Sequence, residues 1–217
     1  MATRGVRWLA LGDVNTIPGE GVRTYVDLAR AEAEALGLVS AEARGGPEWT
    51  SAEIMRAAGS EDGAGVVSVM IGTFDHAVDP GRGGPRVPLS EFRENMREAL
   101  RAVSGWEGLG RRPDGGPCII VMTPPFCTTG IGRTGLELSQ ERLSRYCAAL
   151  LEIAEEFDAV PVDINTIFGG SVRWSDDRLR RVWTEYGDGL TLNSIAHRLI
   201  YPYVRGALKA CVVGAGS

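Results

Sequence analysis

The sequence predicts an α/β fold in which a parallel sheet lies between two layers of helices. Two observations predict it: short apolar runs alternate with amphipathic helical runs along the 217 residues, and no linker or internal repeat divides the chain. Repeated strand-then-helix units favour a parallel sheet with helices on both faces and right-handed crossovers. The length suits one domain with a full hydrophobic core. We therefore expect a single domain over residues 1–217.

The first half of the chain contains three expected strands, each followed by a helix. The run over 65–71 is apolar and β-branched, which is typical of a buried central strand. Thr50 or Ser51 can cap the second helix, and Glu53 is placed for a capping box. The expected elements are strand 6–11, helix 22–36, strand 38–43, helix 51–58, strand 65–71 and helix 88–103.

The second half continues the alternation and ends in a helix. We expect strand 117–122, helix 138–157, strand 160–162, helix 176–186 and helix 193–209. Two loops stand out by composition. Residues 77–87 are rich in Gly, Pro and Arg, and residues 127–137 are rich in Gly and Thr. The first loop is a candidate to cover a substrate, although a solvated loop is the default expectation.

The composition excludes several classes of function. The net charge is -5 and no basic stripe occurs, which disfavours nucleic-acid binding. No apolar stretch approaches the roughly 20 residues of a membrane span, and the first residues lack the apolar segment of a signal peptide. We therefore expect a cytoplasmic protein without a membrane partner. The four cysteines lack the spacing of a zinc site and are expected to be free thiols.

Four short motifs follow one another along the chain. They are Gly12-Asp13-Val14, Ile71-Gly72-Thr73-Phe74-Asp75, Met122-Thr123-Pro124-Pro125 and Asp188-Gly189-Leu190-Thr191-Leu192-Asn193, and residues 87–92 and 160–163 add two more. In order and spacing, this set resembles the SGNH (GDSL-type) hydrolases, within them the isoamyl-acetate-esterase-like branch. The resemblance implies a three-layer α/β/α sandwich with a five-stranded, mainly parallel sheet.

The resemblance also implies that the usual catalytic residues are replaced. In the family, a serine at the end of the first strand attacks an ester carbonyl, a histidine takes its proton, and an aspartate three residues earlier orients that histidine. The serine position falls on Val14 and the histidine position on Thr191, so only Asp188 remains. Val14 has no nucleophilic atom, and a threonine hydroxyl is too weakly basic to replace histidine. Ordinary serine hydrolysis is therefore not expected.

The family's oxyanion hole is altered as well. Its asparagine amide falls on Phe74, which has no side-chain donor. Backbone N–H groups near Val14, and those of Gly45 or Gly46, are the remaining candidates to stabilise an oxyanion. These replacements favour an apolar pocket. The residues expected to line it are Val14, Asn15, Gly46, Phe74, Phe126, Cys127, Tyr186 and Thr191.

Four polar residues are the candidates for acid–base chemistry at this pocket: Asp13, Asp75, His76 and Asp188. Carboxylates in an enclosed apolar site tend to have raised pKa values and can act as general acid or base. His76, one of only two histidines and expected at the edge of the sheet, is the better candidate for a general base, whereas the three aspartates also have structural interpretations. Asp13 and Asp75 can bond amides of their own turns, and Asp188 can hold its loop. The other histidine, His197, is expected to be structural or exposed.

Three hypotheses of function remain, all with a small-molecule ligand and with no metal or cofactor. The first is an enzyme that binds an apolar molecule and promotes a non-hydrolytic step, such as cyclisation, isomerisation or elimination, in natural-product biosynthesis for instance. The second is a pseudoenzyme that binds without turnover. The third is an esterase with a relocated nucleophile, Cys127 or Thr16, although the sequence places no cation beside Cys127 to activate it. A homo-oligomer is compatible with all three.

Overall fold

A five-stranded parallel sheet forms the centre of the computed structural model, which describes residues 5–17, 20–60, 63–131, 135–171, 183–184 and 188–212. The strand order is β2-β1-β3-β4-β7. The strands are β1 Val6–Gly12, β2 Leu38–Gly45, β3 Val66–Met70, β4 Ile119–Met122 and β7 Val160–Val162. β7 is one edge of the sheet, and Pro161 lies in its middle.

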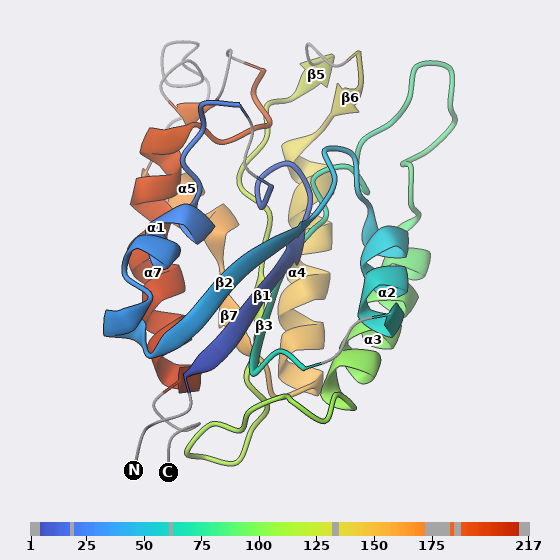
Figure 1. Cartoon of the computed structure of the whole chain (residues 1–217). Helices are drawn as coiled ribbons and strands as arrows, with labels where there is room; N and C mark the ends of the chain where they lie inside the picture. Colours follow the sequence, from blue (N-terminus) through green and yellow to red (C-terminus); the bar gives the residue numbers. More distant parts are fainter. Residues whose placement is uncertain are drawn as a thin grey trace.

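Helices cover both faces of this sheet (Figure 1). The helices α1, α5 and α7 lie on one side, and α2, α3 and α4 lie on the other. Their bounds are α1 Tyr25–Ala31, α2 Ser51–Ser60, α3 Leu89–Ser104, α4 Gln140–Glu156, α5 Ile164–Ser171 and α7 Ser194–Val212, with a 3-10 turn at Glu34–Leu36. This arrangement confirms the three-layer α/β/α sandwich with a five-stranded sheet.

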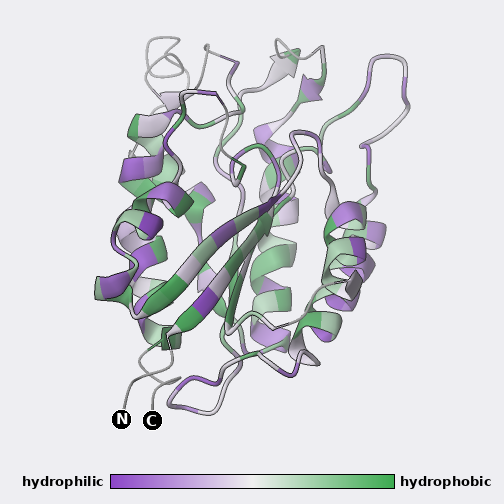
Figure 2. Cartoon of the chain, in the orientation of Figure 1, coloured by the Kyte–Doolittle hydropathy of each residue, from purple (hydrophilic) through white to green (hydrophobic). Residues whose placement is uncertain are grey.

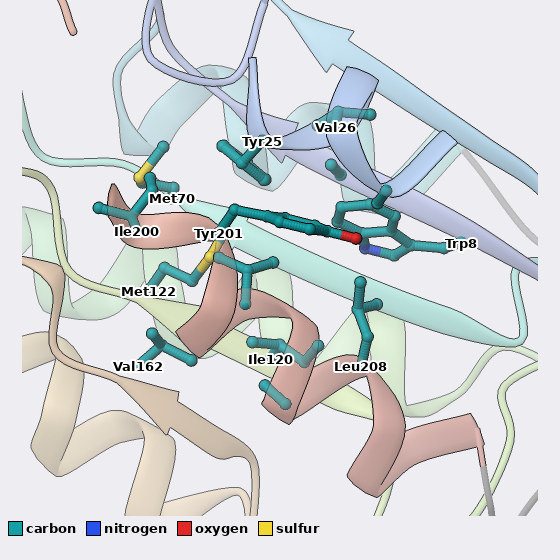
Figure 3. Packing of buried hydrophobic residues seen from close by; sticks show 14 of the residues in the cluster. Trp8, Tyr25, Val26, Met70, Ile120, Met122, Val162, Ile200, Tyr201 and Leu208 are labelled. Carbon is teal, nitrogen blue, oxygen red and sulfur yellow. The ribbon is translucent and has the colours of Figure 1, made fainter. Parts of the chain in front are cut away.

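The strands supply two hydrophobic cores because successive side chains point to opposite faces of the sheet. Along β1, Trp8 and Ala10 pack with α1 and α7, whereas Leu9 and Leu11 pack with α2 and α3. Figure 3 shows the first core, in which the Trp8 ring lies close to Val26 and Tyr201. Figure 2, coloured by hydropathy, shows many hydrophobic residues in the strands and on α4, and hydrophilic residues mainly on the outer sides of the helices.

Capping explains where two of the helices begin. Before α2, the backbone N–H and the hydroxyl of Thr50 both donate to Glu53 Oε2, at 2.8 and 2.6 Å. This contact confirms the expected pairing of the cap with Glu53. Before α1, Thr24 and Asp27 form a complete capping box. Each such cap satisfies N–H groups that a helix start leaves without intrahelical partners.

Three sequence predictions differ from the structure. The expected helix over 22–36 is two shorter elements, because the chain leaves α1 after Ala31 and then tightens into the 3-10 turn. The loop over 127–137 contains an antiparallel pair, β5 Gly130–Ile131 and β6 Glu137–Leu138. α5 was not expected, because its segment is short and rich in glycine. The expected helix over 176–186 lies almost entirely outside the described residues.

The buried hydrogen bond of Trp8 offers a test of the first core. Trp8 Nε1 donates to Ser68 Oγ at 3.0 Å, and Ser68 is fully buried on β3. Replacing Trp8 by Phe should lower the free energy of unfolding by about 2–4 kcal/mol, because it removes this donor and leaves a cavity. Urea denaturation measures the change. Ser68→Ala, which leaves the Trp8 N–H without an acceptor but makes no large cavity, should cost less, about 1–2 kcal/mol; equal effects would contradict this account.

Candidate functional site

The sequence-predicted residues gather where the strands end. Asp13 follows β1 directly, and Asp75 and His76 lie shortly after β3. Parallel strands place these ends at one edge of the sheet, where ligands of open α/β folds bind. In Figure 1 this edge is the upper one, beside β5 and β6. The loop at 188–193 reaches the same edge through contacts with Asn15.

Asn15 holds three of these segments together. Its Oδ1 accepts the backbone N–H of Leu192 at 2.8 Å, and its Nδ2 donates to the Leu190 carbonyl and to Thr73 Oγ1, each at 3.4 Å. The side chain is fully buried. Asn15 is therefore a structural link between the first-strand turn, the β3 loop and the 188–193 loop, and its polar atoms face the interior.

Asp188 lies beside Thr191, and both are half-buried. Asp188 Oδ1 accepts the backbone N–H groups of Leu190 and Thr191, at 2.8 and 2.9 Å. This turn confirms that Asp188 shapes its own loop. No residue among those that the structure describes donates to its second oxygen, Oδ2. Asp188 is also the only one of the four acid–base candidates that is not fully buried.

Val14 packs against an apolar cluster in the region where the family resemblance places a serine nucleophile. We call this group the site cluster, and it also contains two of the four cysteines. Its buried members are Phe74, Ala77, Cys127, Leu136, Leu138, Leu143, Cys147 and Leu190. Val14 itself is half-buried. At this position the chain therefore has an aliphatic side chain that packs on apolar residues.

Asp13 and Asp75 form a buried acidic pair. Asp13 Oδ1 accepts the N–H of Asn15 at 3.0 Å, and Asp75 Oδ1 accepts the N–H of Ser51, the first residue of α2, at 2.8 Å. Burial raises the pKa of Asp13 to about 6, although contacts with Thr73 and Asn15 oppose the shift. Burial raises the pKa of Asp75 to about 7, and the charge of Asp13 adds to this rise. Each carboxyl therefore favours its neutral form more than an exposed one does.

His76 lies against Cys127 in the same interior. His76 Nδ1 is 3.1 Å from the Gly72 carbonyl oxygen, which can only accept a hydrogen bond, so this nitrogen carries the proton. His76 Nε2 then accepts from the Cys127 thiol, 3.4 Å away. Burial lowers the pKa of His76 to about 4 and raises that of Cys127 to about 12, although Arg142 on α4 opposes the latter shift. Both groups are therefore neutral at physiological pH.

The remaining candidates are not all in the site cluster. Phe126 packs against the core formed with α1 and α7, on the other side of the sheet. Gly46 is buried and so close to the Trp49 ring that a Cβ atom would collide with it. Thr16 is fully buried and shares a hydrogen bond of 3.0 Å with the Tyr25 hydroxyl. Tyr186 lies outside the described residues.

Sequence reasoning missed several partners of the buried polar groups. Ser51 donates to the Asp75 carboxyl group from 24 positions earlier in the chain. Arg142 donates to the His76 carbonyl from 66 positions later. No local pattern predicts such contacts. His197 is buried on α7, and burial lowers its pKa to about 4, which fits the structural alternative. The four cysteines are free thiols, as expected.

The described part of the chain offers no obvious ligand set for a metal. No group of three or more His, Cys, Asp or Glu side chains in it is arranged to hold an ion. In the same part, no helix combines the length and the apolar character that crossing a membrane requires.

The chain was compared with known proteins. No family model and no curated protein matches its sequence. Solved structures match its fold over nearly its whole length. A lipase/acylhydrolase from Enterococcus faecalis is 19% identical with a TM-score of 0.70, and the match covers 94% of this chain and 95% of that one. A mutant of an acetyl-xylooligosaccharide esterase from Geobacillus stearothermophilus is 20% identical with a TM-score of 0.70, covering 94% of each chain.

These similarities confirm the SGNH-hydrolase-like fold that the motifs imply. A structure from Lactobacillus plantarum is similar too, at 13% identity and a TM-score of 0.65, covering 96% of this chain and 98% of that one. Three variants of the Geobacillus esterase are described as catalytic mutants, and they replace a serine, an aspartate and a histidine by alanine. In that esterase, the aspartate precedes the histidine by three residues.

Proposed function

We propose that this protein is an enzyme on a hydrolase-like scaffold that binds a mostly apolar small molecule and promotes a non-hydrolytic step by proton transfer. One observation carries the proposal. At the strand ends, the half-buried side chains include an aliphatic one, Val14, and the Asp188 carboxylate, whose Oδ2 has no donor among the residues that the structure describes. The apolar residues of the site cluster favour an apolar ligand, and the carboxylate can accept and donate a proton.

The spacing of the replaced residues supports the loss of ester hydrolysis. Asp188 and Thr191 are three positions apart, as are the catalytic aspartate and histidine of the Geobacillus esterase. The chain therefore keeps the aspartate of such a triad and lacks its base. Without a serine at Val14, no hydroxyl is placed there for a base to activate.

Asp188 is the residue to which we assign the chemistry. Its Oδ1 is fixed by two backbone N–H groups, so its Oδ2 is held in one orientation. Asp188 would take a proton from the bound molecule at one atom and return it at another. Isomerisation and ring closure both balance in this way and need no oxidant, reductant or water. Asp13, Asp75 and His76 are fully buried, so we assign them no contact with the ligand.

A pseudoenzyme is the second candidate, and burial of the other polar groups favours it. Three of the four acid–base candidates are fully buried, and burial shifts the pKa of each toward its neutral form, which suits a scaffold better than a set of proton carriers. The protein would then bind its ligand and release it unchanged. The relocated-nucleophile hypothesis is weaker, because Cys127 is buried with a raised pKa and the Thr16 hydroxyl faces Tyr25.

The proposed function is tested first with a binding screen. A library of apolar ketones, aldehydes and alcohols is screened by thermal shift, and the compounds that bind are incubated with the protein and followed by liquid chromatography and mass spectrometry. We expect conversion to a product of the same mass, from isomerisation or ring closure, or, for an elimination, to a product lighter by the leaving group together with the proton that Asp188 removes and passes to it. Asp188→Asn should lower the conversion rate by about 10²–10⁴-fold and change the Kd little.

Asp163→Asn is the matched control. Asp163 Oδ1 also accepts a backbone N–H, that of Thr166, and it lies after β7. This variant should keep the conversion rate of the unmodified protein. Unchanged ligand after long incubation would favour the pseudoenzyme. Release of p-nitrophenol from p-nitrophenyl acetate or butyrate, abolished by Asp188→Asn, would overturn the non-hydrolytic proposal.

A further inference from the structure

Two cysteines outside the candidate site join the last helix to the sheet. Cys118 lies directly before β4, and Cys211 lies in the last turn of α7, 93 positions later. Both are fully buried in the core formed with α1 and α7. The Cys118 thiol donates to the Cys211 carbonyl oxygen at 3.2 Å. The two side chains are therefore in reach of each other across a packed interface.

The surroundings make the two thiols unequal. The contact with Cys211 lowers the pKa of Cys118, and the nearby guanidinium groups of Arg112 and Arg111 lower it further. The same contact, together with burial, raises the pKa of Cys211. The thiolate is the reactive form of cysteine. Of the two thiols, Cys118 is therefore the one that ionises more readily, and Cys211 lies beside it.

A surface cavity lies beside this pair of cysteines. The cavity has a volume of about 690 Å³, and its walls include Arg112 on one side and Lys209 and Ala210 on the other. Ala210 is the chain neighbour of Cys211. Arg112 donates to the carbonyl oxygen of Pro117, the residue before Cys118. Neither cysteine lines the cavity itself, so a small oxidant reaches the thiols when the last turn of α7 opens locally.

We propose that Cys118 and Cys211 form a reversible disulfide when the protein meets a hydroperoxide. The Cys118 thiolate attacks the peroxide oxygen and becomes a sulfenic acid as water leaves. The Cys211 sulfur then attacks the Cys118 sulfur, a second water leaves, and the S–S bond forms. Two thiols and one hydrogen peroxide thus give one disulfide and two waters. The disulfide joins the end of α7 to the residue before β4. This proposal does not depend on the proposed function.

Oxidation of the purified, reduced protein tests this proposal. After hydrogen peroxide and then iodoacetamide under denaturing conditions, the intact mass should show two free thiols in place of four, and dithiothreitol should restore all four. Peptide mapping should join the peptides of Cys118 and Cys211. The melting temperature should rise on the order of 5–10 °C, because a long loop is closed in the unfolded chain.

Two variants sharpen the result. In Cys211→Ser, hydrogen peroxide with dimedone should label Cys118, because the sulfenic acid then has no partner thiol. The double variant Cys127→Ser/Cys147→Ser, which removes the thiols of the site cluster, should oxidise like the unmodified protein. Four thiols that stay free, or a disulfide that maps to Cys127 and Cys147, would overturn the proposal, and both outcomes can be read from the unmodified protein alone.

Discussion

Replacement of Asp75 by Asn should change how the stability of the protein depends on pH. The change in the free energy of unfolding from pH 4 to pH 8 should be more favourable to folding in the variant than in the unmodified protein, by on the order of 4 kcal/mol. The buried Asp75 carboxyl has its pKa raised from 3.8 to about 7, chiefly by burial. Its contribution to stability is therefore full below pH 3.8 and is lost as the pH rises through about 7. Asparagine keeps the oxygen that accepts from Ser51 and never ionises.

The two buried histidines act in the opposite direction. Burial lowers the pKa of both His76 and His197 from 6.5 to about 4, so their contribution is present above pH 6.5 and is lost as the pH falls toward 4. Between pH 4 and 6.5 the histidines and the acidic pair largely cancel in the unmodified protein. Above pH 6.5, only the ionisation of Asp75 continues to lower the free energy of unfolding.

Urea denaturation at pH values from 4 to 8 measures this prediction. In Asp75→Asn the free energy of unfolding should rise with pH up to about 6.5 and then level. Asp13→Asn is the companion variant, and its effect should appear at lower pH, because burial raises the pKa of Asp13 only to about 6. Parallel pH profiles for Asp75→Asn and the unmodified protein would show that Asp75 ionises normally in the folded state.

Replacement of Asn15 by Ala should lower the free energy of unfolding by on the order of 3–4 kcal/mol. The change removes three hydrogen bonds and leaves the backbone N–H of Leu192 and the carbonyl of Leu190 without their partner in the interior. An unsatisfied buried polar group costs about 1–3 kcal/mol. The loss should also loosen the 188–193 loop, because Asn15 is its contact with the first-strand turn.

Hydrogen exchange separates this local effect from a general loss of stability. In Asn15→Ala the amide of Leu192 should exchange faster than the amides of α7. Asn193→Ala is the matched control: Asn193 Oδ1 also accepts two backbone N–H groups, those of Ile195 and Ala196, but at a half-buried helix start. That variant should cost about 1 kcal/mol. Equal costs for the two variants would contradict the role given to Asn15.

The fold was predictable because its signals are local. The buried strands are short apolar runs, and the alternation of β1 between Trp8 and Leu9 is enough to divide its side chains between two cores. The motifs then identify the layer arrangement. The one described helix that the sequence did not predict, α5, was missed for local reasons as well. It begins only two residues after β7, is short and is rich in glycine, so neither its length nor its composition is typical of a helix.

The candidate site was predictable in position and less so in character. Because the carboxyl ends of parallel strands meet at one edge of the sheet, the sequence correctly places Asp13, Asp75 and His76 at that edge. That all three are completely buried could not be predicted, because residues distant in sequence surround them, such as Ser51 beside Asp75 and Tyr146 beside His76. The contact of His76 with Cys127 spans 51 positions and has no local signature. Among the four acid–base candidates, Asp188 is therefore the one whose carboxylate is open to a ligand.

The proline in β7 has a consequence for how the protein behaves at high concentration. β7 is an edge of the sheet, and such edges invite pairing with another chain and aggregation. The Val162 carbonyl accepts from Thr123 toward the interior of the sheet, so the backbone of Pro161 faces outward. Proline has no N–H to offer at that position. An incoming strand would find no donor at the middle of this three-residue edge, which discourages the self-association to which an exposed edge strand is otherwise prone.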